Sequence, residues 1–273
     1  TMILSGMFPY YLTNSITTFS DIFFETMSGY TATGSTILDD VESLPKSIIF
    51  WRSMTHWLGG MGIIVLAIAI LPLLGIGGMQ LFSAEAPGSG ISGDKIHPRI
   101  SATAKRLWFI YFGLTIFETL ALSIAGMSFF DALNHSMSNI ATGGFSTKNE
   151  SLAYWNSTPA IQYIVIFFMI LAGTNYLLIY SALIGNFKKL FSNTEFSWYI
   201  TFILVFVLIT SFSIYNYVDL QQTSFKHPEI FGKFESSFRH AFFQIVAIIT
   251  TTGFVTADFA GWTPFLTMLF FAL

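Results

Sequence analysis

The chain has 273 residues, of which 53% are hydrophobic, 18% are aromatic and only 10% are charged. Soluble domains carry about 25% charged residues, so this composition excludes a soluble globular protein. The formal net charge of −3 gives no indication of a nucleic-acid partner, and the absence of cysteine excludes disulfides and thiolate metal sites.

Four apolar runs are long enough to cross a membrane. About 20 apolar residues cover the hydrocarbon core of a bilayer. Backbone groups within lipid must be hydrogen-bonded inside their own segment, which favours helices. The runs cover residues 48–74, 107–125, 161–184 and 198–214. The sequence therefore predicts an all-α, multi-pass membrane protein that is embedded in the lipid bilayer.

The first unit in chain order is a short apolar helix, a polar loop and a spanning helix. These elements are predicted over residues 19–30, 31–36 and 46–74, and an opening helix before them is expected to be nearly absent. A helix of about 12 residues is too short to span a bilayer, so it is predicted to be re-entrant. Non-helical backbone at membrane depth is tolerated only where it is buried or lines water. The loop is therefore expected to face a channel.

The same order of elements occurs twice more along the chain. The second copy is predicted over residues 103–125, 129–140, 141–148 and 158–186, and the third over residues 195–217, 234–250, 250–256 and a helix from residue 262. When the three copies are aligned with one another at offsets of 110 and 109 residues, Gly34, Gly144 and Gly253 occupy the same column of the alignment. Three copies at nearly equal spacing predict equivalent units around one pore.

The three loops are predicted to form the selectivity filter of a cation pore. Selecting a dehydrated cation requires a ring of carbonyl oxygens that replaces its hydration shell. Glycine tolerates the backbone angles that such a ring demands. The helix before each loop also directs its partially negative C-terminal end toward the cation. The predicted filter residues are Thr31, Ala32, Thr33, Gly34, Ser35, Ala141, Thr142, Gly143, Gly144, Phe145, Thr250, Thr251, Thr252, Gly253 and Phe254.

Two further glycine-containing segments are candidates for pore contact or for close helix packing. Gly173, Thr174 and Asn175 interrupt a predicted spanning helix beneath the second loop and are interpreted as a partly unwound pore-side segment or as packing. Residues 58–62 are assigned to packing, because small residues let helix backbones approach closely.

Four polar side chains fall within the apolar segments. Glu118 lies in the middle of a predicted span, where charge is costly, and is interpreted as hydrogen-bonded to a neighbouring helix or as functional. Arg52 is expected either to pair with outer acidic residues or to extend toward the interface. His135 is expected to pack behind the filter, and His56 is given a structural role.

Charge predicts the orientation of the units. The 12 Lys and Arg residues divide evenly between the two sides, so the prediction depends mostly on the acidic residues. The basic residues in the two connections opposite the loops, which the positive-inside rule would make cytoplasmic, are Lys95, Arg99, Lys105, Arg106, Lys188 and Lys189. Most of the 15 acidic residues lie on the loop side. An acidic outer vestibule, in which Glu25 is included, would concentrate cations.

These motifs resemble the TrkH/KtrB/HKT superfamily of cation transporters, most closely its bacterial TrkH branch. The resemblance covers essentially the whole chain and rests on the three loops and on residues 50–53, 57–62, 70–72, 75–80, 84–88 and 98–100. It implies four helix–pore-loop–helix repeats around one pore. The chain is then expected to be a fragment with repeat one at residues 1–74, a cytoplasmic connection at 75–102, repeat two at 103–190 and a truncated repeat three at 195–273.

The resemblance implies potassium uptake by the pore-forming subunit of a Trk-type system in the bacterial inner membrane. Potassium would be the substrate, bound through filter carbonyls, with no covalently bound cofactor and no enzymatic activity. A homodimer and a cytosolic nucleotide-binding regulatory subunit of the TrkA type are also implied. Basic connections are candidate contact surfaces for that subunit.

Other functions are open alternatives. One is a sodium-permeable or weakly selective cation transporter. Glycine in all three loops favours potassium, since relatives with serine in the first loop tend toward sodium. A polytopic membrane enzyme is disfavoured because the five histidines are scattered along the chain. A scaffold without transport would not require three similar loops.

Overall fold

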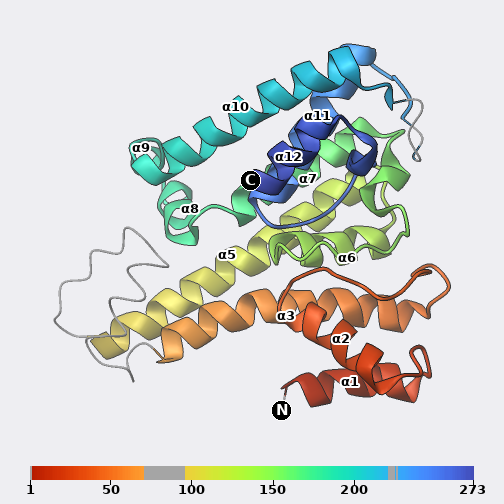
Figure 1. Ribbon diagram of the computed structural model, residues 1–273. Coiled ribbons are helices and arrows are strands. Elements are labelled where there is room, and N and C mark those ends of the chain that lie inside the picture. Colours follow the sequence, from red (N-terminus) through yellow and green to blue (C-terminus); the bar gives the residue numbers. More distant parts are fainter. Residues whose placement is uncertain (1, 71–95, 221–224, 226) are drawn as a thin grey trace.

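The protein is described by a computed structural model that covers residues 2–70, 96–220, 225 and 227–273 (Figure 1). Those residues form helices joined by loops and contain no β-strand. The α-helices are α1 (Met2–Leu12), α2 (Phe19–Tyr30), α3 (Lys46–Ile70), α5 (Ile96–Ile124), α6 (Phe129–Ile140), α7 (Pro159–Ala172), α8 (Tyr176–Leu183), α9 (Phe187–Phe191), α10 (Thr194–Tyr217), α11 (Lys233–Ile249) and α12 (Pro264–Ala272). Within the described residues, 3-10 turns cover Ser151–Trp155 and Phe259–Gly261.

Three of the four predicted spans agree with long apolar segments, whereas the predicted run at 48–74 corresponds to α3 and continues past the described residues at Ile70. Within the described residues, Arg106–Ile124 of α5 and all of α10 are long and apolar enough to cross a membrane, and α7 with α8 forms a third span if the bent pair is counted as one. Helix α5 begins at Ile96, before the predicted residue 103. Residues 71–95, which include most of the predicted connection, Lys95 and the segments at 75–80 and 84–88, lie outside the described residues.

The short helices occur where the sequence predicts them. Helices α2 and α6 have the predicted bounds, and α11 begins and ends one residue before its prediction. Ser128 begins α6 as its N-cap, because its Oγ accepts from the backbone N–H of Asp131 at 3.1 Å. Each of the three is shorter than the spans, as a re-entrant helix requires.

The expectation that the opening helix of the first unit is nearly absent is wrong. Helix α1 covers Met2–Leu12. Its buried Met7 and Tyr10 pack in one hydrophobic cluster with residues of α2 and α3. The indole Nε1 of Trp51 also donates to the Gly6 carbonyl at 2.9 Å. These contacts between segments distant in sequence stabilise a helix that its own short apolar run does not predict.

The units lie side by side in chain order (Figure 1). Helices α1 to α3 form one side of the molecule, α5 and α6 the middle, and α10 to α12 the other side. Helix α6 packs against α3, α5 and α7, and α11 packs against α7 and α10. Each of these short helices therefore contacts both its own unit and the outgoing helix of the preceding unit.

Two glycines in α3 allow its backbone to lie close to the end of α2 and to the start of the second loop. A Cβ atom at Gly59 would collide with the carbonyl oxygen of Tyr30, the last residue of α2. A Cβ atom at Gly60 would lie only 3.1 Å from the Cα atom of Ala141. These contacts support the packing interpretation of residues 58–62.

We predict that Gly59→Ala destabilises the protein by about 1–3 kcal/mol, because the added methyl group forces the backbones of α2 and α3 apart. Gly62→Ala is the matched control, since a Cβ atom there would have no neighbour within 4 Å among the described residues. Thermal unfolding in detergent measures the effect. Equal Tm values for the two variants would contradict the packing role of Gly59.

Candidate functional site

The three short helices end in the same hydrogen-bonded turn. In the first unit, the backbone N–H groups of Ala32 and Thr33 donate to the carbonyls of Gly29 and Ser28. The equivalent bonds are Thr142 to Asn139 and Gly143 to Ser138, and Thr251 to Ile248 and Thr252 to Ala247. This is the Schellman motif, which closes the last turn of a helix and sends the chain away from the helix axis.

Two residues in each loop have positive φ angles. The angle is 51°, 54° and 56° at Ala32, Thr142 and Thr251, and 77°, 79° and 77° at the three column glycines. The loops therefore share one backbone conformation. Sequence reasoning identified the glycine and missed the first position, because left-handed φ is unfavourable for alanine and threonine and nothing in the sequence predicts it there.

The loops meet through these glycines. A Cβ atom at Gly34 would collide with the carbonyl oxygen of Gly143 and lie 3.7 Å from the Cα atom of Gly144. A Cβ atom at Gly144 would collide with the carbonyl oxygen of Thr252 and lie 3.3 Å from the carbonyl carbon of Gly253. At Gly253 a Cβ atom would meet no described atom within 4 Å. The first loop thus abuts the second, and the second abuts the third.

The loop carbonyls have no protein donor. In the part of the chain that the structure describes, no side chain and no backbone N–H donates to the carbonyl oxygens of residues 31–35, 141–145 or 250–254. Residues 31–35 are exposed or half-buried, and the second and third loops alternate buried with more exposed residues, so water or an ion can reach these carbonyls. Three sets of unpaired carbonyls, each following the negative end of a helix, together form a concentration of electronegative oxygen that suits a cation.

Hydroxyl pairs stiffen two of the loops. Thr31 and Thr33 form a hydroxyl–hydroxyl hydrogen bond of 2.8 Å, and the equivalent Thr250 and Thr252 form one of 2.8 Å. The second loop has alanine and glycine at these positions. There a Cβ atom at Gly143 would collide with the imidazole of His56. A histidine ring from α3 therefore occupies the space that a threonine side chain would need.

Polar side chains of the short helices hold the outer end of each loop. Thr36 Oγ1 donates to the Glu25 carboxylate at 2.9 Å, and Ser146 Oγ pairs with His135 Nε2 at 2.9 Å. Glu25 and His135 occupy one column of the repeat alignment, and Thr36 and Ser146 occupy another. The position of His135 behind the second loop confirms its predicted location.

A second set of equivalent contacts starts from helix residues that lie one turn before the positions of Glu25 and His135. Thr147 Oγ1 donates to Asp131 Oδ1 at 2.6 Å, and Thr256 Oγ1 pairs with His240 Nδ1 at 3.0 Å. Asp131 and His240 occupy one alignment column, as do the two threonines. In both units a threonine after the filter residues pairs with the same position of the short helix, but that position is a carboxylate in the second unit and an imidazole in the third.

Arg52 and Glu25 form a buried ion pair and do not lie in an outer vestibule. Arg52 Nε lies 2.8 Å from Glu25 Oε1, and both side chains are almost completely buried. The placement of Glu25 among vestibule acids is therefore wrong, and so is the alternative that Arg52 extends to the interface. The helix α2 places Glu25 on the face that packs against α3, which shields the carboxylate from water.

Glu118 is hydrogen-bonded to a neighbouring helix, as one interpretation predicted. Asn139 Nδ2 donates to Glu118 Oε1 at 2.6 Å, and the Glu118 side chain is fully buried. Asn139 Nδ2 also lies 3.3 Å from the carbonyl oxygen of Val165 in α7. Asn139 supplies a carbonyl to the Schellman turn, so Glu118 fixes the side chain of a residue that shapes the second loop.

The predicted interruption at residues 173–175 is a sharp bend. Helix α7 ends at Ala172, α8 begins at Tyr176, and the two axes differ by 106°. Asn175 Oδ1 accepts from the backbone N–H of Leu177 and so begins α8. A Cβ atom at Gly173 would lie 2.9 Å from Cγ2 of Thr250. The bend therefore lies at the base of the third loop as well as near the second.

Polar contacts also join the outer connections of the first two units. Asn149 Nδ2 donates to Asp40 Oδ1 at 2.8 Å, and Lys148 Nζ lies 3.1 Å from Glu42 Oε2. The hydrogen bond from Asn149 holds the pKa of the exposed Asp40 carboxyl below its usual value. No group of three His, Cys, Asp or Glu residues within the described ranges is arranged to hold a metal ion.

These features define a helical membrane protein built from helix–pore-loop–helix units. A family model described as "TrkH: Cation transport protein" matches residues 2–272. The chain therefore belongs to the TrkH family of cation transport proteins.

Individual relatives agree with that assignment. The Trk system potassium uptake protein TrkH of Salmonella typhimurium is 44% identical over 97% of this chain and 52% of its own length. The protein of the same name from Escherichia coli K12 is 42% identical over the same shares. The crystal structure of the potassium transporter TrkH from Vibrio parahaemolyticus matches 99% of this chain and 52% of that chain, with a TM-score of 0.81 and 35% identity. The chain spans about half the length of these relatives.

We predict that Glu118→Ala lowers the stability of the protein by about 1–3 kcal/mol, because the buried amide of Asn139 loses an acceptor. Glu118→Gln keeps a carbonyl oxygen for that bond and should retain most of the wild-type Tm. Thermal unfolding of both variants in detergent distinguishes them. The role assigned to Glu118 fails if alanine and glutamine give the same Tm.

Proposed function

We propose that the protein containing this chain takes up potassium across the bacterial inner membrane as the pore-forming subunit of a Trk-type system. The observation that carries this proposal is the set of three loops that share their backbone angles, meet at their glycines and leave their carbonyls without protein donors. Two relatives with the printed name of potassium uptake protein support potassium as the substrate.

The proposed filter consists of residues 31–35, 141–145 and 250–254. Its carbonyl oxygens replace the hydration shell of the ion. The C-terminal ends of α2, α6 and α11 add partial negative charge. The hydroxyl pairs and the buried braces hold the carbonyls at a fixed spacing, so a smaller ion gains fewer simultaneous contacts.

A fourth filter loop completes the ring in this proposal. Gly34 abuts the second loop and Gly144 abuts the third, whereas a Cβ atom built at Gly253 would meet no described atom within 4 Å. The relatives are about twice as long as the matched region. We assign residues 1–74, 103–190 and 195–273 to repeats one, two and three, and residues 75–102 to the connection between the first two. Gly173, Thr174 and Asn175 are proposed to lie on the pore side.

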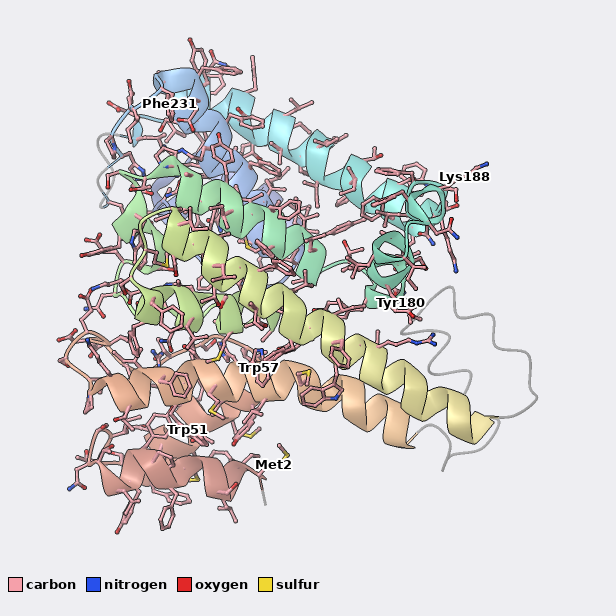
Figure 2. All side chains as sticks on the ribbon, turned by 180° about the vertical axis from the view of Figure 1, so that it is seen from behind. Met2, Trp51, Trp57, Tyr180, Lys188 and Phe231 are labelled. Carbon is pink, nitrogen blue, oxygen red and sulfur yellow. The ribbon has the colours of Figure 1, made fainter. Side chains whose placement is uncertain are left out.

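The proposed partners are a second copy of the protein and a cytosolic nucleotide-binding subunit of the TrkA type. Lys188 lies at one end of the molecule, beside Tyr180 and opposite Phe231 (Figure 2). Arg106 stacks over the Tyr180 ring at 5.0 Å, so the basic start of α5 lies at the same end. This basic end is proposed to be cytoplasmic.

We predict that Gly144→Ser and Gly34→Ser each lower the preference for potassium over sodium about tenfold, a loss of about 1.4 kcal/mol of discrimination. A side chain at either position collides with a carbonyl of the next loop and displaces the ring. Gly62→Ser is the matched control, because a Cβ atom there would meet no described atom within 4 Å.

The measurement is potassium and sodium uptake by the natural protein that contains this chain, in cells that lack other potassium transporters, with protein level held equal. Unchanged potassium preference in both filter variants would show that these glycines do not form the filter. Sodium uptake that exceeds potassium uptake in the unaltered protein would instead favour the sodium-permeable alternative.

A further inference from the structure

We propose that Arg52 is a positioning residue that fixes the first two filter loops relative to one another and thereby sets ion selectivity. This inference rests on the proposed function. Arg52 lies on α3, outside all three loops, and contacts no proposed filter carbonyl.

A single guanidinium connects three segments. Its Nε lies 2.8 Å from Glu25 on α2, and NH2 lies 3.2 Å from the hydroxyl of Thr36 at the end of the first loop. NH1 donates at 3.4 Å to the carbonyl of Ser146, the first residue after the filter positions 141–145 of the second loop. The guanidinium carbon lies 4.1 Å from the centre of the Phe145 ring, within the second loop itself. Arg52 therefore contacts both loops, in addition to the direct contact between the loops at Gly34.

The contacts of Phe145 extend this link. Its ring stacks on His56 with a centroid distance of 3.9 Å and an interplanar angle of 12°. His56 Nδ1 also pairs with Ser138 Oγ at 2.9 Å. Two side chains of α3 therefore bracket the second loop at the residue directly after its glycine. A shift of α3 would move that loop.

Burial makes the geometry of Arg52 strict. Arg52 is 1% exposed and Glu25 is 0% exposed. Taking both charges out of water is costly, and such a pair often contributes no more stability than well-packed apolar residues of similar volume. The planar guanidinium with its fixed donor directions does provide a defined geometry between its partners. The pair therefore contributes mainly by fixing the relative positions of the first two loops, and less by adding stability.

The next pair of units has a neutral counterpart at the same place. Gln162 on α7 lies 18 residues after Gly144, as Arg52 lies 18 residues after Gly34. Gln162 Nε2 donates to Asn156 Oδ1, and Asn156 Nδ2 donates to the carbonyl oxygen of Thr256 after the third loop at 3.0 Å. In both cases a side chain of the outgoing helix is linked to a backbone carbonyl just after the filter residues of the next unit, directly from Arg52 on α3 and through Asn156 from Gln162 on α7. In the first case the link is one charged side chain. In the second it is two neutral side chains, of which Gln162 also accepts from the buried guanidinium of Arg239 on α11, itself paired with Glu235.

The test removes the pair without leaving a buried charge. Glu25→Gln/Arg52→Met keeps similar volumes and is expected to fold with a Tm close to that of the unaltered protein. Its potassium-over-sodium flux ratio should fall about tenfold, because discrimination depends on carbonyl spacing. Glu42→Gln/Lys148→Met is the matched control, since that ion pair also joins the first two units but is open to solvent on both partners and lies beyond the filter residues 31–35 and 141–145. The control should keep the ratio.

Arg52→Lys separates geometry from charge. A lysine keeps the positive charge beside Glu25 but lacks the planar fork that reaches Thr36 and Ser146. We expect the flux ratio of this variant to fall as well. Fluxes are measured in proteoliposomes with the purified natural protein, together with the Tm of each variant.

The outcomes are distinct. A wild-type flux ratio in the double variant would overturn the positioning role of Arg52 and leave the proposed function intact. If the double variant cannot be purified, a wild-type ratio in Arg52→Lys would overturn that role. Absence of potassium flux through the unaltered protein would contradict the proposed function itself.

Discussion

The rest of the structure depends on the exposure of unpaired backbone carbonyls inside an apolar protein. Among the residues that the structure describes, no protein group donates to these oxygens in the three loops. A bilayer does not tolerate this arrangement unless water or an ion takes the place of the missing partners. Such a loop lacks the backbone hydrogen bonds that stabilise a helix or sheet. Its conformation must therefore be fixed by contacts with the helices that surround it. The Schellman turns, the hydroxyl pairs and the buried polar braces all serve that purpose.

The braces follow one plan with varied chemistry. Glu25 and His135 occupy equivalent positions, and both hold a hydroxyl at the outer end of their loop. The first unit adds a cation from α3, whereas the second inserts the ring of His56 where its loop lacks a threonine. Similar backbone angles in all three loops show that different side chains maintain one conformation. Repeats can therefore diverge in sequence while the carbonyl geometry is kept.

Much of the fold could be predicted from local pattern. The short helices, the spans and the bend at Gly173 follow from apolar run length and from the small and polar residues that end those runs. The family followed from motifs along the whole chain, and the comparisons confirm it. Helix α1 could not be predicted, since contacts with α2 and α3 stabilise it. Pairing of Arg52 with an acidic residue was one predicted alternative, but the burial of its pair with Glu25 was missed, because residues 27 apart in sequence give no local signal that packing will shield them from water.

The most direct test is to locate bound ions in the natural protein that contains this chain. Rubidium or thallium in place of potassium gives an anomalous signal in crystals, and both are large monovalent cations. We predict a peak on the axis where the loops of Gly34, Gly144 and Gly253 meet, within coordination distance of their carbonyl oxygens. An ordered, well-phased map with no peak there, or with the ions bound only elsewhere, would contradict the claim that these loops form the filter.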